Sequence, residues 1–102
     1  MKVELLHIDE CPNWKQAGER LRAALDKVGR TGDIIDNVLL RTPEEAAQYP
    51  FAGSPTILLD GEDPFPNGGP ISQLACRVYR TETGLAGSPT TEQLTVALQE
   101  RA

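Results

Sequence analysis

The sequence predicts an α/β fold in the order β-α-β-α-β-β-α, with a four-stranded mixed sheet and three helices in one domain, residues 1–102. Three patterns support this prediction. Both faces of the first strand candidate carry apolar residues, as in strands that lie inside an α/β sheet. A helical apolar stripe follows it directly, and the last two strand candidates adjoin before a closing helix. A chain of 102 residues is long enough to bury one hydrophobic core.

The first strand is predicted over residues 2–9, and the first helix from Pro12 to about residue 28. Pro12 suits the first turn of a helix, where its missing N–H costs nothing. Apolar residues then recur at spacings of three and four, which is typical of one helix face. They are Trp14, Ala17, Leu21, Leu25 and Val28. Gly29 follows at the position where helices commonly end.

A strand, a short helix and another strand are predicted for the middle of the chain. The strand covers about residues 33–41. Thr42 and Glu45 then have the spacing of a capping box, which opens the short helix. The apolar run TILLD, residues 56–60, predicts the third strand.

The C-terminal part is predicted to contain a long loop, the fourth strand and the last helix. The loop begins with Asp60, Glu62 and Asp63, which we interpret as a solvated turn because they lack the ligand spacing of a calcium-binding loop. The fourth strand is expected over residues 74–81, where alternation places Arg77 and Tyr79 on one face and Cys76 on the other, and a connector follows. Thr90 and Gln93 then form a second predicted capping box.

Composition narrows the classes of function. The net charge of -5 argues against a nucleic-acid or anionic-membrane partner, because both normally require a basic surface. The chain has no apolar run of about 20 residues, and its first residues alternate between apolar and polar, unlike a secretory signal. We therefore expect a cytoplasmic protein without a membrane partner. In that compartment the two cysteines would rest as thiols, and their spacing does not predict a metal site.

Cys11 is the residue with the clearest chemical potential. It lies where the first strand ends and the first helix begins, so unpaired helix N–H groups and the positive end of the helix dipole would stabilise its thiolate. Asp9 and Glu10 oppose this effect through their negative charge. We expect a modest net lowering of the pKa of Cys11. The alternative is a cysteine that only caps the helix.

His7 and Trp14 flank this position in the sequence. Trp14 is expected to fill the core between the helix and the sheet, and the alternative is a wall of an apolar substrate pocket beside Cys11. His7 is expected to hydrogen-bond within the sheet, and the alternative is a Cys-His dyad with Cys11.

The order of three features resembles the thioredoxin-like superfamily. A cysteine opens the first helix directly after the first strand, Ser54-Pro55-Thr56 precedes the third strand, and the third and fourth strands adjoin before a closing helix. More closely, the chain resembles short bacterial proteins described as thioredoxin family or alkylmercury-lyase-like. The resemblance covers nearly the whole chain.

The resemblance implies specific roles for these residues. It implies a cis peptide bond at Pro55 beside the active cysteine, and substrate contacts from Pro12, Trp14, Ser54, Pro55 and Thr56. An ordinary trans proline at the start of a strand is the alternative for Pro55. Two departures are clear. Trp14 replaces the second cysteine of the redox motif, and the link over residues 61–73 is much longer than the family's tight turn.

Cys76 is the only other thiol that could resolve a mixed disulfide at Cys11. In the resembled fold, the fourth strand starts at the sheet end away from Cys11. Four or five strand residues would then separate the sulfurs by more than the ~6 Å Cα spacing of a disulfide. We therefore expect a buried, inert strand cysteine, with a resolving thiol placed by the long loop as the alternative.

Three functional hypotheses follow. The first is a monothiol oxidoreductase, in which Cys11 exchanges with a protein or small-molecule thiol or disulfide, and an outside thiol or Cys76 resolves the product. The second is a non-enzymatic binding module that uses the surface beside Pro55 and Trp14. The third is soft-metal handling by Cys11, Cys76 and Asp9, as the likeness to organomercurial lyases implies. None of them requires a bound cofactor.

Overall fold

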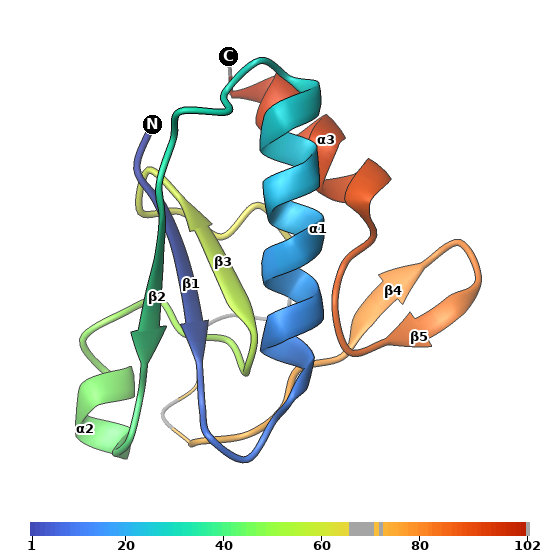
Figure 1. The fold of residues 1–102 in the computed structure, drawn as a ribbon. Coiled ribbons are helices and arrows are strands. Elements are labelled where there is room, and N and C mark those ends of the chain that lie inside the picture. The colour runs from blue at the N-terminus through green and yellow to red at the C-terminus, as the bar shows by residue number, and fades with distance from the viewer. Residues whose placement is uncertain (66–70, 72, 102) are drawn as a thin grey trace.

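The computed structural model of the chain describes residues 1–65, 71 and 73–101 (Figure 1). Its elements alternate along the chain up to the third strand and then form a hairpin and a closing helix. They are β1 (Val3–His7), α1 (Asn13–Lys27), β2 (Ile35–Leu39), α2 (Pro43–Ala46), β3 (Thr56–Leu59), β4 (Tyr79–Thr81), β5 (Gly84–Ala86) and α3 (Thr91–Glu100). The fold is therefore a mixed α/β fold with three helices, as predicted.

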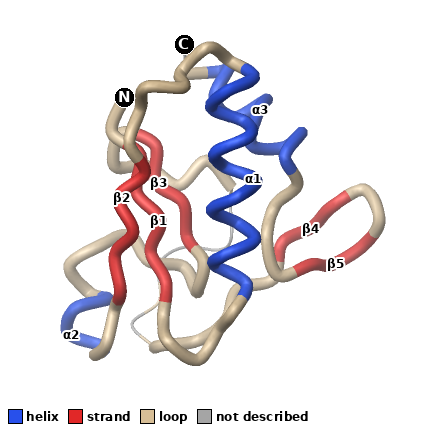
Figure 2. The backbone as a smooth tube through the Cα atoms, in the orientation of Figure 1, coloured by secondary structure: helices blue, strands red, loops and turns tan. Residues whose placement is uncertain are grey.

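The main sheet has three strands in the order β2-β1-β3 (Figure 2). β1 runs parallel to β2, with Leu5 opposite Asn37, and antiparallel to β3, with Leu5 opposite Ile57. All five residues of β1 are buried, which confirms that both faces of this strand are covered. The central strand therefore carries its apolar side chains into two separate cores.

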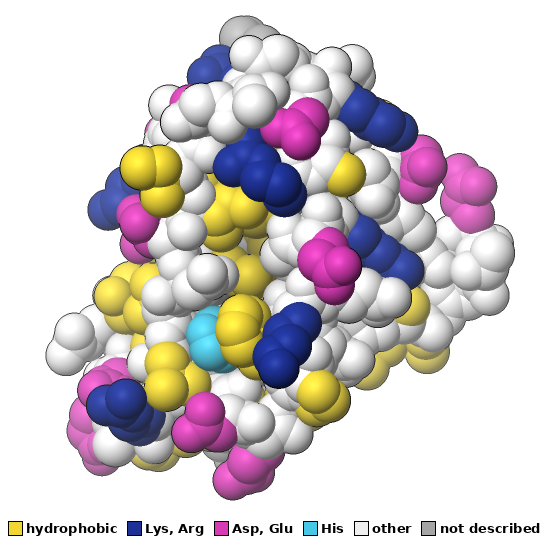
Figure 3. All heavy atoms as spheres, in the orientation of Figure 1, with side chains coloured by type: hydrophobic (Ala, Val, Ile, Leu, Met, Phe, Trp, Pro, Cys, Tyr) yellow, Lys and Arg dark blue, Asp and Glu magenta, His cyan; other side chains and the backbone are white. Residues whose placement is uncertain are grey.

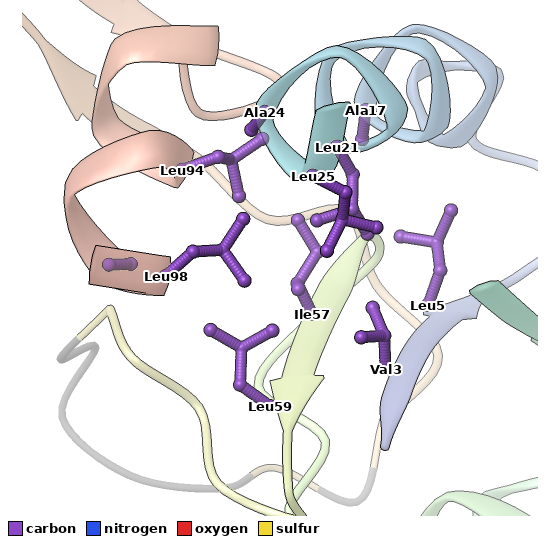
Figure 4. Close-up of a cluster of buried hydrophobic side chains, with 11 residues drawn as sticks. Val3, Leu5, Ala17, Leu21, Ala24, Leu25, Ile57, Leu59, Leu94 and Leu98 are labelled. Carbon is purple, nitrogen blue, oxygen red and sulfur yellow. The ribbon is translucent and has the colours of Figure 1, made fainter. Parts of the chain in front are cut away.

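The larger core lies between the sheet and the pair of helices α1 and α3, which pack against each other (Figure 4). Its buried members are Val3, Leu5, Ala17, Leu21, Ala24, Leu25, Ile57, Leu59, Leu94, Ala97 and Leu98. The smaller core lies on the opposite face, because strand residues alternate in direction. Its buried members are Leu6, Ile8, Cys11, Leu40, Ala46, Phe51 and Leu58.

Local sequence signals position the helices close to where they were expected. α1 begins at Asn13 with Pro12 as its N-cap, so Cys11 lies one residue before the cap. Gly29 has a φ of 79° just after the helix, which is the left-handed geometry that favours glycine. At α3, Thr90 and Gln93 form the complete capping box that was predicted.

The capping arrangement of α2 differs from the prediction in one detail. The Thr42 hydroxyl accepts a hydrogen bond from the backbone N–H of Glu45 at 3.1 Å, as expected. The Glu45 carboxylate, however, accepts from the backbone N–H of Arg41 at 2.7 Å instead of from Thr42. The carboxylate therefore reaches one residue further back and fixes the end of the loop that leaves β2.

The predicted fourth strand is the main departure from the expected fold. Of residues 74–81, only Tyr79–Thr81 forms a strand, and it pairs with β5 in a separate two-stranded sheet. The predicted connector contains β5, because Glu82 and Thr83 form the turn of a hairpin that continues into Gly84. The predicted four-stranded sheet is thus replaced, in the described residues, by a three-stranded sheet and a hairpin. Part of the long link, residues 66–70 and 72, lies outside the described residues.

The surface carries mixed charge. On the face seen in Figure 3, acidic and basic side chains are interspersed, and hydrophobic side chains lie around the histidine. Among the helices of the described residues, none is long and apolar enough to cross a membrane.

Candidate functional site

Cys11 and Cys76 form a disulfide, although 65 positions separate them in the sequence. Their Cα atoms lie 6.0 Å apart. The expectation that strand geometry would keep these sulfurs apart is therefore wrong. Cys76 does not lie inside a continuous fourth strand that starts at the far end of the sheet. It lies on an irregular segment that contacts Ser54, just before β3, through an isolated parallel bridge.

Ser54 connects the segments that carry the two cysteines. Its hydroxyl accepts a hydrogen bond from the backbone N–H of Ile8, at the end of β1, at 3.1 Å. Its backbone N–H donates to the carbonyl of Ala75, and its carbonyl accepts from the N–H of Arg77, both at 2.8 Å. Ser54 is completely buried. It therefore fixes the residues on both sides of Cys76 next to the strand that leads to Cys11.

Arg77 anchors the same segment from the interior. Its side chain is only 1% exposed and forms an ion pair with Asp63 at 2.7 Å. The guanidinium also donates to the carbonyl of Phe65 and lies 4.4 Å from the ring centre of Tyr79. Asp63 was expected in a solvated turn, and this part of the prediction is wrong, because the carboxylate turns inward to neutralise a buried cation.

Two further contacts hold the segment against the start of β3. The Tyr79 hydroxyl donates to the carbonyl of Pro55, and burial raises the pKa of Tyr79 well above its usual range. Gly53 has a φ of 109°, and a Cβ atom there would lie 2.8 Å from the Cβ atom of Arg77. Glycine is therefore required at this position both for its backbone geometry and for the close approach of Arg77.

The two cysteines differ sharply in exposure. Cys11 has 0% of its surface exposed and packs within the smaller apolar core. Cys76 is exposed to solvent. Asp9 and Glu10 are also exposed, so their carboxylates are hydrated and their repulsion of charge on Cys11 is screened. The prediction that Cys76 would be a buried strand cysteine is therefore wrong.

His7 and Trp14 stack on each other beside the sheet, with ring centres 4.0 Å apart and an interplanar angle of 15°. His7 is buried, and burial lowers the pKa of its imidazole. Its Nδ1 atom is buried and has no hydrogen-bond partner among the described residues, so the predicted hydrogen bond within the sheet is not formed at this atom. Trp14 packs against the larger core from its edge and is only half-buried, so it fills the predicted role of a core aromatic only in part.

The structure brings most of the predicted site residues to one end of the sheet. The Ser54–Pro55 peptide bond is cis, as the resemblance implied. Ser54, Pro55 and Thr56 are all buried in the disulfide-bonded form, whereas Pro12 is exposed. The Thr56 hydroxyl is held internally, because it accepts from the N–H of Ala52 at 3.1 Å and donates to the carbonyl of Gly53.

Sequence reasoning did not identify the residues that hold Cys76 in place. They are Gly53, Asp63, Arg77 and Tyr79. The alternation over residues 74–81 correctly places Arg77 and Tyr79 on one face, but it does not indicate that this face is buried. In residues 1–65, 71 and 73–101, the structure contains no group of three or more His, Cys, Asp or Glu side chains that could hold a metal ion.

Comparisons of the chain with protein-family models, with curated proteins and with solved structures find no match. The site is therefore interpreted from its own geometry.

Proposed function

We propose that the protein is a thiol–disulfide exchange protein in which Cys11 and Cys76 alternate between a disulfide and two thiols. The observation that carries this proposal is the pairing of the two cysteines of the chain across 65 positions, with one partner exposed to solvent. Exposed disulfides are generally more easily reduced than buried structural ones. The partner would be a thiol or a disulfide of a protein or a small molecule.

The position of Cys11 supports redox chemistry. Cys11 lies one residue before the N-cap of α1, close in the chain to the first turn, where backbone N–H groups are unpaired and the helix dipole is positive. Both effects favour the thiolate, whereas the apolar core around Cys11 disfavours it. The helix therefore supplies the interaction that lets a buried sulfur carry a negative charge during exchange.

The proposed reaction transfers two electrons without a cofactor. A thiolate of the partner attacks one sulfur of the Cys11–Cys76 disulfide, and the other sulfur leaves as a thiolate. A second thiol of the partner then breaks the mixed disulfide. The partner dithiol is oxidised to a disulfide, and the Cys11–Cys76 pair is reduced to two thiols. The two protons that leave the partner's thiols are matched by the two that the cysteines take up through solvent, so the overall exchange balances. The reverse sequence reduces a partner disulfide.

A thioredoxin-like architecture is part of the proposal. The strand order β2-β1-β3, with one parallel and one antiparallel neighbour of β1, supports it. So does the position of Cys11 between β1 and α1, with the Ser54–Pro55 segment beside it. Trp14 occupies the position of the second cysteine in the Cys-x-x-Cys spacing, and in this proposal Cys76 supplies the second thiol instead.

A redox titration tests this function. The protein is equilibrated in buffers of reduced and oxidised dithiothreitol, quenched in acid, and scored for free thiols by mass spectrometry after alkylation. We expect a reversible two-electron transition in the folded protein, together with accelerated reduction of oxidised glutathione by dithiothreitol.

Two variants serve as controls. Cys11→Ser and Cys76→Ser should each lose the two-electron transition, whereas Cys11→Ser keeps the exposed thiol. A disulfide that stays oxidised below about −300 mV, as structural disulfides do, and that gives no acceleration would contradict the proposal.

A further inference from the structure

We infer that partners react with Cys76 and not with Cys11, so that the mixed disulfide forms at Cys76 while Cys11 is the leaving and resolving thiol. This inference rests on the proposed exchange function and assigns the order of its steps. It reverses the roles predicted from the sequence, in which Cys11 exchanges with the partner and Cys76 or an outside thiol resolves the product. Three properties of the pair carry the argument: access to each sulfur, the quality of each leaving group, and the rigidity of each backbone.

Access separates the two sulfurs most clearly. A thiolate must reach the sulfur that it attacks from the side opposite the leaving sulfur. Cys11 is fully buried among apolar side chains that include Ile8, Phe51 and Leu58. Such an approach to Cys11 would require the smaller core to open. Cys76 is exposed as a residue, and we therefore infer that an outside thiolate reaches its sulfur without disturbing the core.

The quality of the leaving groups also favours attack at Cys76. Attack at Cys76 expels Cys11 as the thiolate, and a leaving thiol with a lower pKa leaves faster. Cys11 lies one residue before the N-cap of α1, where helix N–H groups stabilise negative charge. Attack at Cys11 would instead expel Cys76, whose neighbour in the chain, Arg77, is already paired with Asp63. The helix therefore favours the direction that access also allows, and it opposes the effect of the apolar core, which disfavours charge on Cys11.

The backbone of Cys76 is suited to present a reacting sulfur. Ser54 donates a hydrogen bond to Ala75 and accepts one from Arg77, and these bonds hold the residues before and after Cys76. The Cys76 sulfur therefore stays near Cys11 after the disulfide is broken. Along the same segment, Val78 is 57% exposed and Arg80 is also exposed, whereas Arg77 and Tyr79 are buried. The outward face thus offers an apolar contact and a positive charge to an approaching anionic thiol.

The steps of this exchange reaction balance in atoms and electrons. The partner thiolate forms a bond to the sulfur of Cys76 while the Cys11–Cys76 bond breaks and Cys11 takes the electron pair. A second thiol of the partner, as its thiolate, attacks the partner sulfur of the mixed disulfide and releases Cys76 as a thiolate. With a monothiol and no second thiol, the reaction stops at the mixed disulfide until Cys11 reverses it.

Trapping with glutathione tests the inference on the wild-type protein. The oxidised protein is mixed with excess reduced glutathione, quenched in acid within milliseconds to seconds, alkylated and digested with trypsin. Cleavage after Lys2, Lys15, Arg41 and Arg77 places the two cysteines on different peptides. At the earliest times we expect glutathione on Cys76 and the alkyl group on Cys11, with at least about tenfold preference.

Rates of the single-cysteine variants provide a second measurement. In Cys11→Ser the remaining thiol should react with an aromatic disulfide reagent at least about tenfold faster than in Cys76→Ser. Each rate is divided by the rate in 6 M guanidinium, which removes the fold and corrects for the intrinsic reactivity of each peptide. For Cys76→Ser, a rate in the folded protein that is lower than the rate in guanidinium would show that the fold protects Cys11.

The outcomes separate this inference from the proposed function. Glutathione on Cys11, or equal amounts on both cysteines from the first time point, would overturn the inference while leaving the exchange function intact. A folded protein that forms no mixed disulfide at either cysteine would overturn both.

Discussion

The two segments that carry the cysteines are built in different ways. Cys11 lies between a regular strand and a regular helix, and its surroundings are the apolar side chains of one core. Cys76 lies on irregular backbone, and polar contacts with Ser54, together with the ion pair of the adjacent Arg77, hold its segment in place. Secondary structure therefore suffices to place the first cysteine, whereas a set of specific buried polar contacts places the second.

The difference shows which contacts bring two distant cysteines together in a disulfide. Burial alone fixes Cys11 because β1 and α1 both contribute to apolar cores. For Cys76, burial is not available, since the residue is exposed. Hydrogen bonds and an ion pair, which are directional, hold its neighbours instead. The following predictions test this difference, beginning with the contact that joins the two segments.

Removal of the disulfide should produce the largest loss of stability. A crosslink between residues 65 positions apart restricts the unfolded chain strongly, and the chain-entropy relation gives about 4 kcal/mol for a loop of this size. Urea unfolding with and without a phosphine reductant, followed by the fluorescence of the single tryptophan, measures this change. The stability of the Cys11→Ser/Cys76→Ser double variant should not change with the reductant. If the reductant destabilises the double variant as much as the wild type, the effect does not come from the disulfide.

Arg77→Met should have the next largest effect. It leaves the Asp63 carboxylate without its partner in a largely buried position, which typically costs about 3 kcal/mol. The matched control is Arg101→Met, which breaks the exposed pair with Glu62 and should cost at most about 1 kcal/mol. Calorimetry or urea unfolding compares the two. Similar losses in both variants would contradict the anchoring role of Arg77.

Gly53→Ala should lower the free energy of unfolding by about 2 kcal/mol or more. The new Cβ atom would overlap the Cβ atom of Arg77, and alanine would have to adopt the φ of 109° that Gly53 has. Gly61→Ala is the control: it has a φ of 82° but no atom within 4 Å of a new Cβ, so it reports backbone strain alone, about 1 kcal/mol. The difference between the two unfolding free energies measures the close approach of Arg77. No difference would mean that the segment moves away without cost.

Tyr79→Phe should lower the free energy of unfolding by about 1 kcal/mol, because the carbonyl of Pro55 loses its hydrogen-bond donor. Burial raises the pKa of Tyr79 in the folded protein, so the neutral phenol is favoured by folding. Its contribution to stability is present below the unfolded pKa of about 10 and is lost as the pH rises above that value. Urea unfolding between pH 8 and 11 should show a smaller alkaline decrease for the variant than for the wild type.

The smallest effect on stability is expected from protonation of His7, in the segment that carries Cys11. Burial lowers the pKa of His7 below its ordinary value of 6.5, so folding favours the neutral imidazole. Its contribution to stability is present above pH 6.5 and is lost as the pH falls below the unfolded pKa. Because the chain has one histidine, a proton NMR titration of the imidazole measures this pKa directly. A midpoint at or above 6.5 would contradict the buried stack with Trp14.

The amino-acid sequence by itself determined the segment around Cys11 and the start of the closing helix. Periodicity predicted β1 and α1, Gly29 predicted the helix end, and the Thr90–Gln93 pair predicted the start of α3. These features depend on residues within a few positions of one another, and their physical causes are local: alternation of side chains, helix capping and backbone freedom.

Only the tertiary structure decided where Cys76 lies. Its position depends on hydrogen bonds to Ser54, an ion pair of Arg77 with Asp63, and a glycine at residue 53 that leaves room for Arg77. The alternating pattern over residues 74–81 suggested a strand continuous with the sheet, but Tyr79–Thr81 pairs with Gly84–Ala86 instead. Contacts between residues far apart in the chain leave no periodic signal, and so the sequence predicted an inert strand cysteine at residue 76, where the folded chain has a disulfide to Cys11.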